Sequence, residues 1–141
     1  MKPERVEPDI AQQLLRIPAQ VGDDLSRFPD FLILGPQRTG TSWLFRHLAA
    51  HPEVFLPREK ETYFFSTLGE PDKAKFRYPN LSAYLRGAMS DSPFYKLRKK
   101  LRSGFRYAPK TLGDATASYA ILEPEVIREI RLINPEIRAL L

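Results

Sequence analysis

The chain has no cysteine and only two histidines among its 141 residues. Without cysteine it can form neither a disulfide framework nor a thiolate metal site. Zinc sites take three or four ligands drawn mainly from cysteine, histidine and carboxylates, so the presence of only two histidines argues against a histidine-based zinc site. We therefore expect a function that needs no metal.

Long apolar runs are also absent. No stretch of the sequence approaches the length of about 18 apolar residues that marks a membrane-spanning helix. The N-terminal segment MKPERVEPDI lacks the apolar centre of a signal peptide. We therefore expect a soluble, cytoplasmic protein without a transmembrane segment. No internal repeat or low-complexity tract is present.

The overall composition is that of a globular domain. Hydrophobic residues make up 43% and charged residues 28% of the chain, which argues against disorder. A chain of this length suits one domain that buries about two thirds of its unfolded surface. The net charge of +5 favours anionic partners such as a nucleotide, an acidic glycan, nucleic acid or a lipid surface, without ranking them.

The most informative stretch runs from Phe31 to Pro52. It begins with the apolar run FLIL, which is typical of a strand covered on both faces of a parallel sheet. The polar turn GPQRTGTS follows, and an amphipathic helix comes next. Apolar pairs at i, i+4 mark that helix: Leu44 with Leu48, and Phe45 with Ala49. A helix N-terminus that follows such a turn presents unpaired N–H groups and a positive dipole, so the pattern predicts an anion site.

The residues of this turn distinguish between two kinds of phosphate loop. Gly35 and Gly40 have the spacing of the nucleoside-triphosphate loop G-x-x-x-x-G-K-[ST], but Thr41 stands where that loop needs lysine. The positive charge lies inside the turn, at Arg38. GPQRTGTSWL instead resembles the loop of sulfotransferases that use 3′-phosphoadenosine 5′-phosphosulfate (PAPS), roughly G-x-x-[KR]-x-G-T-[ST]-x-L. Glycosaminoglycan sulfotransferases usually have lysine at this position, and protein-tyrosine sulfotransferases have arginine.

The resemblance implies a set of donor-binding residues. These are Pro36, Gln37, Arg38, Thr39, Gly40, Thr41, Ser42 and Trp43. The loop amides and the two hydroxyls after Gly40 would hold the 5′-phosphosulfate, and Arg38 would stabilise the charge that builds on the leaving phosphate. Trp43 would stack on the adenine, as in the cytosolic small-molecule branch, or would pack the helix against the sheet. The resemblance implies no metal.

A second resemblance follows the first predicted helix. Sulfotransferases of the glycan and bacterial type have a segment like P-x-x-K-E-x-x-[FY]-F, and Pro57, Lys60, Glu61, Phe64 and Phe65 fit it. There the matching glutamate is the proposed base, because a hydroxyl or amine that attacks sulfur must lose its proton. Glu61 is thus the candidate base and Lys60 an assisting charge. The alternative is that Glu61 is an ordinary solvated carboxylate; the aromatic pair is expected in the core.

A third segment, Asp114 to Tyr119, resembles the family pattern G-[DE]-x-[ST]-x-x-Y, which faces the acceptor cleft. It equally fits an ordinary exit from a strand. Between the second and third segments we expect a loop from Ser66 to Asn80 and a short helix through Leu85. A helix starting at Pro124 and a strand from Ile137 should follow.

The segment from Ser92 to Arg106 is rich in lysine and arginine and has no acidic residue. Phe94, Leu97 and Leu101 recur at i, i+3, i+7, which predicts a helix that packs through these residues. Its charged face would be solvated, or would collect an anionic acceptor or the donor's phosphates. Nucleic-acid binding is a further alternative, but no recognised module surrounds the segment, so we expect no specific nucleic-acid partner.

Together these patterns predict an α/β fold: a three-layer parallel sheet flanked by helices, P-loop-NTPase-like and of the sulfotransferase type. Residues 1–29 should form an N-terminal extension with a short helix from Asp9 to Ile17. Residues 30–141 should form the N-terminal half of a sulfotransferase domain. The family segment R-D-P-x-x-R-x-x-S, which holds the donor's 3′-phosphate, is absent from the sequence. We therefore expect a truncated domain that is inactive alone.

The predicted function is sulfuryl transfer from PAPS to a hydroxyl or amine acceptor. A carbohydrate, anionic glycans included, or a small natural product is favoured over a phenol, a lipid or a peptide tyrosine. Two alternatives stay open. One is a nucleotide-dependent phosphotransferase with the same strand, loop and helix; the other is a non-catalytic module whose basic segment binds a polyanion. The sequence does not indicate an oligomeric state.

Overall fold

A computed structural model describes Ile17, Gln20, Arg38 and residues 22–35, 40–58 and 60–140. Within these residues, four parallel strands form one sheet in the order β2-β3-β1-β4. The strands are β1 (Phe31–Ile33), β2 (Val54–Phe55), β3 (Thr111–Ala115) and β4 (Arg138–Leu140). The strand predicted from the FLIL run lies inside the sheet, between β3 and β4, and its three residues are buried.

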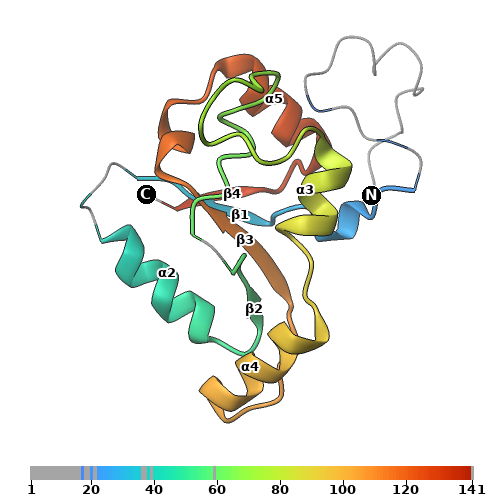
Figure 1. The fold of residues 1–141 in the computed structure, drawn as a ribbon. Helices are drawn as coiled ribbons and strands as arrows, with labels where there is room; N and C mark the ends of the chain where they lie inside the picture. Colours follow the sequence, from blue (N-terminus) through green and yellow to red (C-terminus); the bar gives the residue numbers. More distant parts are fainter. Residues whose placement is uncertain are drawn as a thin grey trace.

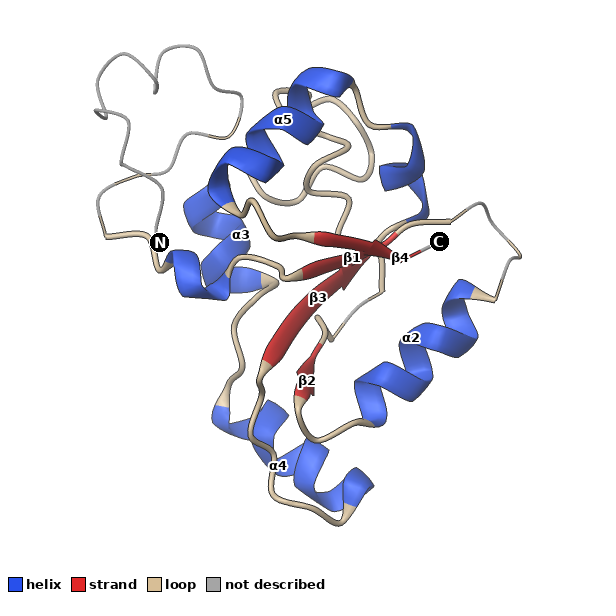
Figure 2. Cartoon of the chain, turned by 180° about the vertical axis from the view of Figure 1, so that it is seen from behind, coloured by secondary structure: helices blue, strands red, loops and turns tan. Residues whose placement is uncertain are grey.

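Helices cover both faces of this sheet, as Figures 1 and 2 show. They are α2 (Thr41–Ala50), α3 (Leu81–Gly87), α4 (Pro93–Ser103) and α5 (Pro124–Ile133), with short 3₁₀ turns η1 (Leu25–Arg27) and η2 (Ala117–Ile121). Successive strand residues point to opposite faces. Phe31 and Ile33 pack with α2, whereas Leu32 packs in the larger cluster that includes α3 and α5. The prediction of an α/β fold with a parallel sheet between helices is confirmed.

Local sequence signals explain where the helices begin. The Asn80 side chain accepts a hydrogen bond from the Ala83 N–H (2.9 Å), and the Ser92 hydroxyl accepts one from the Tyr95 N–H (3.2 Å). Pro124 occupies the first turn of α5, where a missing N–H costs nothing. The stretch from Ser66 to Asn80 contains turns and bends and neither helix nor strand, as predicted.

The apolar positions of α4 correct the prediction made for them. Phe94, Leu97 and Leu101 are 64%, 55% and 77% exposed. The helix packs instead through Tyr95 and Lys99, whose side chain is buried. The Tyr95 hydroxyl donates to the Leu56 carbonyl (2.9 Å), and the Lys99 ammonium donates to the carbonyls of His51 (2.9 Å) and Val54 (2.8 Å).

The reason for this packing lies at the edge of the sheet. Among the described strands, β2 lies at the edge of the sheet, so its outward carbonyls face no neighbouring strand there. Buried carbonyls must find hydrogen-bond donors, and α4 supplies them from Tyr95 and Lys99. The hydrogen bonds to these carbonyls therefore decide which face of α4 packs on the sheet, and the apolar side chains of Phe94, Leu97 and Leu101 stay exposed.

Some predictions fall outside the described residues. They are most of the short helix from Asp9 to Ile17, the turn residues Pro36, Gln37 and Thr39, and the last residue, Leu141. Ile17 itself is buried, and its N–H donates to the Glu129 carboxylate (2.8 Å). The division into an extension (1–29) and a half-domain (30–141) remains a prediction.

Candidate functional site

The turn between β1 and α2 leads into the N-terminus of α2, which has no hydrogen bond from a capping side chain. Gly40 is the N-cap residue, with φ of 89°, a conformation that costs glycine little and other residues more. Having no side chain, Gly40 cannot bond the first amides of α2, so those amides remain suited to a ligand. Arg38 is exposed and also has a positive φ, of 72°. Such a conformation is uncommon in a non-glycine residue and is found most often in tight turns and functional sites.

The second predicted segment reaches this helix N-terminus. The Lys60 ammonium donates to the Ser42 hydroxyl (2.8 Å) and to the Thr41 hydroxyl (3.3 Å). A nucleoside-triphosphate loop carries its lysine at the position of Thr41. Here the Lys60 ammonium lies at the same first turn of α2, although Lys60 belongs to the segment after β2. A cation, two hydroxyls and the amides of a helix N-terminus together favour an anion.

Glu61 follows Lys60 in the chain, and its position is fixed by its own backbone and by Tyr63. The Glu61 N–H donates to the carbonyl of Ala115 at the end of β3 (2.8 Å). The Tyr63 hydroxyl donates to the Glu61 carboxylate, and this bond raises the pKa of Tyr63. Glu61 and Tyr63 have φ of 70° and 57°, so the segment turns sharply on both sides of Thr62. Glu61 is partly exposed, as a base that meets a substrate must be.

Among the described residues, Arg38 makes no hydrogen bond or ion pair with Lys60 or Glu61. The structure thus brings Lys60 into contact with Thr41 and Ser42, and Glu61 is the residue that follows Lys60. The Arg38 side chain is exposed to solvent.

The third predicted segment is a buried anchor. Asp114 is fully buried, and its Oδ2 accepts hydrogen bonds from the hydroxyls of Thr62 (2.7 Å), Tyr84 (2.7 Å) and Tyr119 (2.9 Å). Burial raises the pKa of Asp114, and the three hydroxyl donors oppose that rise. The side chains of Asp114 and Tyr119 are therefore enclosed within the fold. They fix Thr62, the residue next to Glu61, to the sheet.

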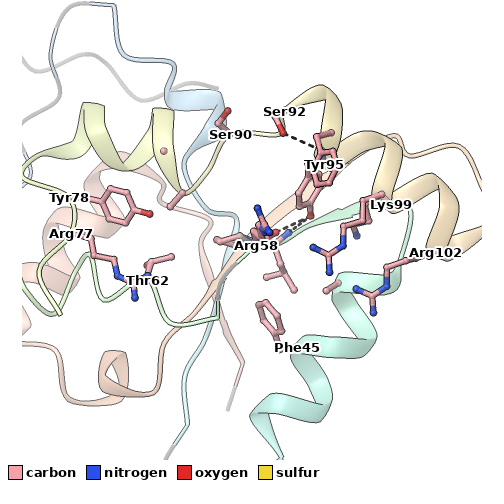
Figure 3. Close-up of a pocket in the computed structure, with 17 residues that line it drawn as sticks. Phe45, Arg58, Thr62, Arg77, Tyr78, Ser90, Ser92, Tyr95, Lys99 and Arg102 are labelled. Carbon is pink, nitrogen blue, oxygen red and sulfur yellow. Dashed lines mark hydrogen bonds between the residues drawn. The ribbon is translucent and has the colours of Figure 1, made fainter. Parts of the chain in front are cut away.

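A cavity of about 680 Å³ lies beside the segment that carries Lys60 and Glu61. Pro57, Arg58 and Thr62 form part of its wall, and α4 forms another part (Figure 3). The cavity lies at the β2 edge of the sheet, and no local pattern in the sequence predicts it. Its walls are assembled from residues far apart in the chain, such as Phe45 of α2 and Arg102 of α4.

With this geometry established, the chain can be compared with known proteins. No protein-family model matches it, and no curated protein matches it in sequence. The solved structure of a sulfotransferase from Alicyclobacillus acidocaldarius is similar, with 27% sequence identity and a TM-score of 0.46. The similarity covers 79% of this chain and 42% of that one, so this chain matches less than half of that protein's length. A TM-score this low does not establish a shared family.

Trp43 lies on the first turn of α2 and is 64% exposed. Its ring lies 4.0 Å, centroid to centroid, from the ring of His47, one helical turn later. The His47 Nδ1 is 2.8 Å from the Trp43 carbonyl oxygen. Of the two roles considered, packing of α2 against the sheet is therefore wrong for Trp43. An exposed indole beside the anion site remains suited to stacking on a base.

Two features are absent from the residues that the structure describes. In that part of the chain, no group of three or more histidine, aspartate or glutamate side chains is arranged to hold a metal ion. Within the same residues, no helix combines the length and the apolar character needed to cross a bilayer.

Proposed function

We propose that the protein is a PAPS-dependent sulfotransferase whose donor's 5′-phosphosulfate binds at the N-terminus of α2. The observation that carries this proposal is the contact of Lys60 with Ser42 and Thr41. Two segments that resemble sulfotransferase motifs are separated along the chain, and their polar groups meet at one helix N-terminus. An arrangement of amides, hydroxyls and an ammonium suits a phosphosulfate, which has several anionic oxygens.

In this reaction the sulfuryl group passes from the bridging oxygen of the phosphosulfate to an oxygen or nitrogen of the acceptor. The bond between sulfur and the bridging oxygen breaks, and adenosine 3′,5′-bisphosphate leaves with the additional negative charge. Lys60 and Arg38 stabilise that charge. Because it develops fully only as the bond breaks, these cations lower the barrier instead of merely tightening donor binding.

Glu61 accepts the proton that the acceptor loses. It is the partly exposed carboxylate next to Lys60, and Tyr63 and the Ala115 carbonyl fix its position. A positioned carboxylate within hydrogen-bond reach of the attacking group is the usual form of a general base. The acceptor is a hydroxyl or amine compound, with a carbohydrate or small natural product favoured.

Thermal unfolding in the presence of nucleotides tests the proposal. Adenosine 3′,5′-bisphosphate should raise the melting temperature of the chain, since a ligand that binds only the folded state stabilises it. ATP with Mg²⁺ should give a smaller shift at the same concentration, because Thr41 replaces the lysine that a triphosphate requires. A larger shift with ATP and Mg²⁺ would favour a phosphotransferase and refute the proposal.

A further inference from the structure

The cavity beside Lys60 and Glu61 is strongly basic. Its lining contains arginine and lysine side chains from three parts of the chain: the segment after β2, the loop before α3, and α4. These residues are Arg58, Arg77, Arg98, Lys99 and Arg102. No aspartate or glutamate is present among the described residues that line it. A concave surface with one sign of charge concentrates ligands of the opposite sign.

The way α4 is fixed explains why its arginines lie at the cavity. Lys99 is 5% exposed and is bonded to the carbonyls of His51 and Val54, which ties this face of the helix to the sheet edge. Arg98 is its neighbour, and Arg102 lies one turn further on. Both arginines are exposed and line the cavity. Figure 3 shows Lys99 and Arg102 on one side and Arg77 and Thr62 on the other, with Arg58 between.

This arrangement of charges is unfavourable without an anion. Arg98 and Arg102 are like charges at i, i+4, a pairing that destabilises a helix. Arg102 also contributes to the lowered pKa of Lys99, after the larger effect of burial. A bound anion would relieve this repulsion. Guanidinium groups suit carboxylate and sulfate in particular, because they can donate two parallel hydrogen bonds to either group.

The rest of the lining has a different character. Phe45, Ala49, Leu56 and Ala88 supply apolar surface, and Ser90 and Ser92 supply hydroxyls. The volume of about 680 Å³ is within the usual range for small-molecule sites. The cavity therefore suits a compound with an apolar body or ring face, hydroxyl groups and one or more anionic groups.

We propose that this cavity binds the sulfate acceptor and selects one that carries a carboxylate or sulfate group. The identification of the ligand as the acceptor rests on the proposed function. It is supported by position, because Pro57, Arg58 and Thr62 line the cavity on either side of Lys60 and Glu61. The anionic group binds the arginines of α4, and a hydroxyl or amine of the same molecule extends toward Glu61.

Calorimetric titration of the chain with three disaccharides tests this proposal. The first carries a uronate and sulfate groups, the second carries a uronate alone, and maltose is neutral. The titrations are made at about 0.15 M salt, where the Debye length of about 8 Å limits long-range attraction. The first two should bind saturably and maltose should not. Their relative affinities distinguish recognition of sulfate from recognition of carboxylate.

A matched pair of double variants locates the site. Arg98→Gln with Arg102→Gln removes two charges from the cavity, and affinity for the anionic disaccharides should fall by about tenfold or more. Lys96→Gln with Lys100→Gln removes two charges from residues of the same helix that do not line the cavity, and should change affinity by less than about twofold. Equal losses in the two variants, or no saturable binding by the unmodified chain, would overturn the proposal.

Titration of the same proteins with adenosine 3′,5′-bisphosphate separates this inference from the proposed function. Both double variants should bind the bisphosphate as the unmodified chain does, because neither changes the N-terminus of α2. If the bisphosphate fails to bind while the disaccharides discriminate as described, the donor assignment is wrong and the anion-selective cavity stands. If the bisphosphate binds and the disaccharides do not, the acceptor inference is wrong and the donor assignment stands.

Discussion

The Lys60 ammonium donates a hydrogen bond to the Ser42 hydroxyl at 2.8 Å, across 18 residues of sequence. This contact joins the segment after β2 to the first turn of α2. It places a cation where the helix already offers unpaired amides and the positive end of its dipole. An anion at this point would meet charge, hydroxyl and amide donors together. The proposed donor site depends on this combination of groups.

Replacement of Lys60 by alanine should weaken binding of adenosine 3′,5′-bisphosphate by about tenfold, as expected for loss of one charge-assisted hydrogen bond. Isothermal titration calorimetry measures the change. Lys73→Ala is the control, because Lys73 is an exposed residue paired with Glu70 and should leave the affinity unchanged. Equal affinities of the Lys60→Ala and unmodified chains would contradict a role for Lys60 in donor binding.

In a full-length sulfotransferase domain that contains this segment, Arg38→Ala should lower the rate of sulfuryl transfer from PAPS by more than about tenfold, because the guanidinium stabilises charge that appears in the transition state. Arg38→Lys keeps the charge and should largely retain the rate. Initial rates with the acceptor in excess provide the measurement. An Arg38→Ala protein with unchanged turnover would count against the assigned role of this loop.

In the same full-length domain, Glu61→Gln should abolish transfer, since the amide cannot accept the acceptor's proton. It should leave binding of adenosine 3′,5′-bisphosphate intact, and calorimetry on the same preparation establishes whether it does. Loss of both properties would show that Glu61 is structural. Full transfer activity in the variant would show that another group is the base.

Lys99 makes stability depend on pH in the alkaline range. Burial lowers its pKa from the ordinary value of 10.5 to about 8, so between these values the unfolded chain binds the proton more tightly than the folded chain. Stability therefore contains a contribution that rises with pH from about 8 to 10.5. Urea unfolding of the unmodified chain and of Lys99→Met should show this rise as a difference between the two proteins. Parallel pH profiles for the two would contradict it.

The exposed apolar face of α4 predicts an unusual tolerance of substitution. Leu101→Ser should change the free energy of unfolding by less than about 0.5 kcal/mol, as is usual for surface positions. Leu85→Ala, at a position 4% exposed in α3, should cost about 2–5 kcal/mol. Chemical denaturation measures both. A cost of several kcal/mol at Leu101 would mean that this face of the helix is buried in solution.

Much of the fold follows from local patterns in the sequence. The strand at Phe31, the turn and α2 were predictable because an apolar run, glycines and an i, i+4 stripe occupy adjacent segments. Asn80 and Pro124 likewise mark the starts of α3 and α5. The orientation of α4 was not predictable, because the carbonyls that Lys99 satisfies belong to residues 45 and 48 positions away.

The candidate site likewise contains residues that the sequence identifies and contacts that only the tertiary structure shows. Lys60 and Glu61 were identified by resemblance, but the contact of Lys60 with Ser42 depends on how two segments pack. The hydroxyls of Thr62 and Tyr84 that bind Asp114 had no signal in the sequence, since each lies far from it along the chain. The basic cavity combines residues from α2, from the segment after β2 and from α4, so only the tertiary structure could show it.

The roles proposed for Arg38, Lys60 and Glu61 all require a phosphosulfate at the N-terminus of α2. Amide chemical shifts, recorded while the isotopically labelled chain is titrated with adenosine 3′,5′-bisphosphate, test this requirement most directly. We predict that the largest changes fall on Arg38, Gly40, Thr41, Ser42 and Lys60. Changes confined to α4 and the cavity, or no changes at saturating ligand, would contradict it.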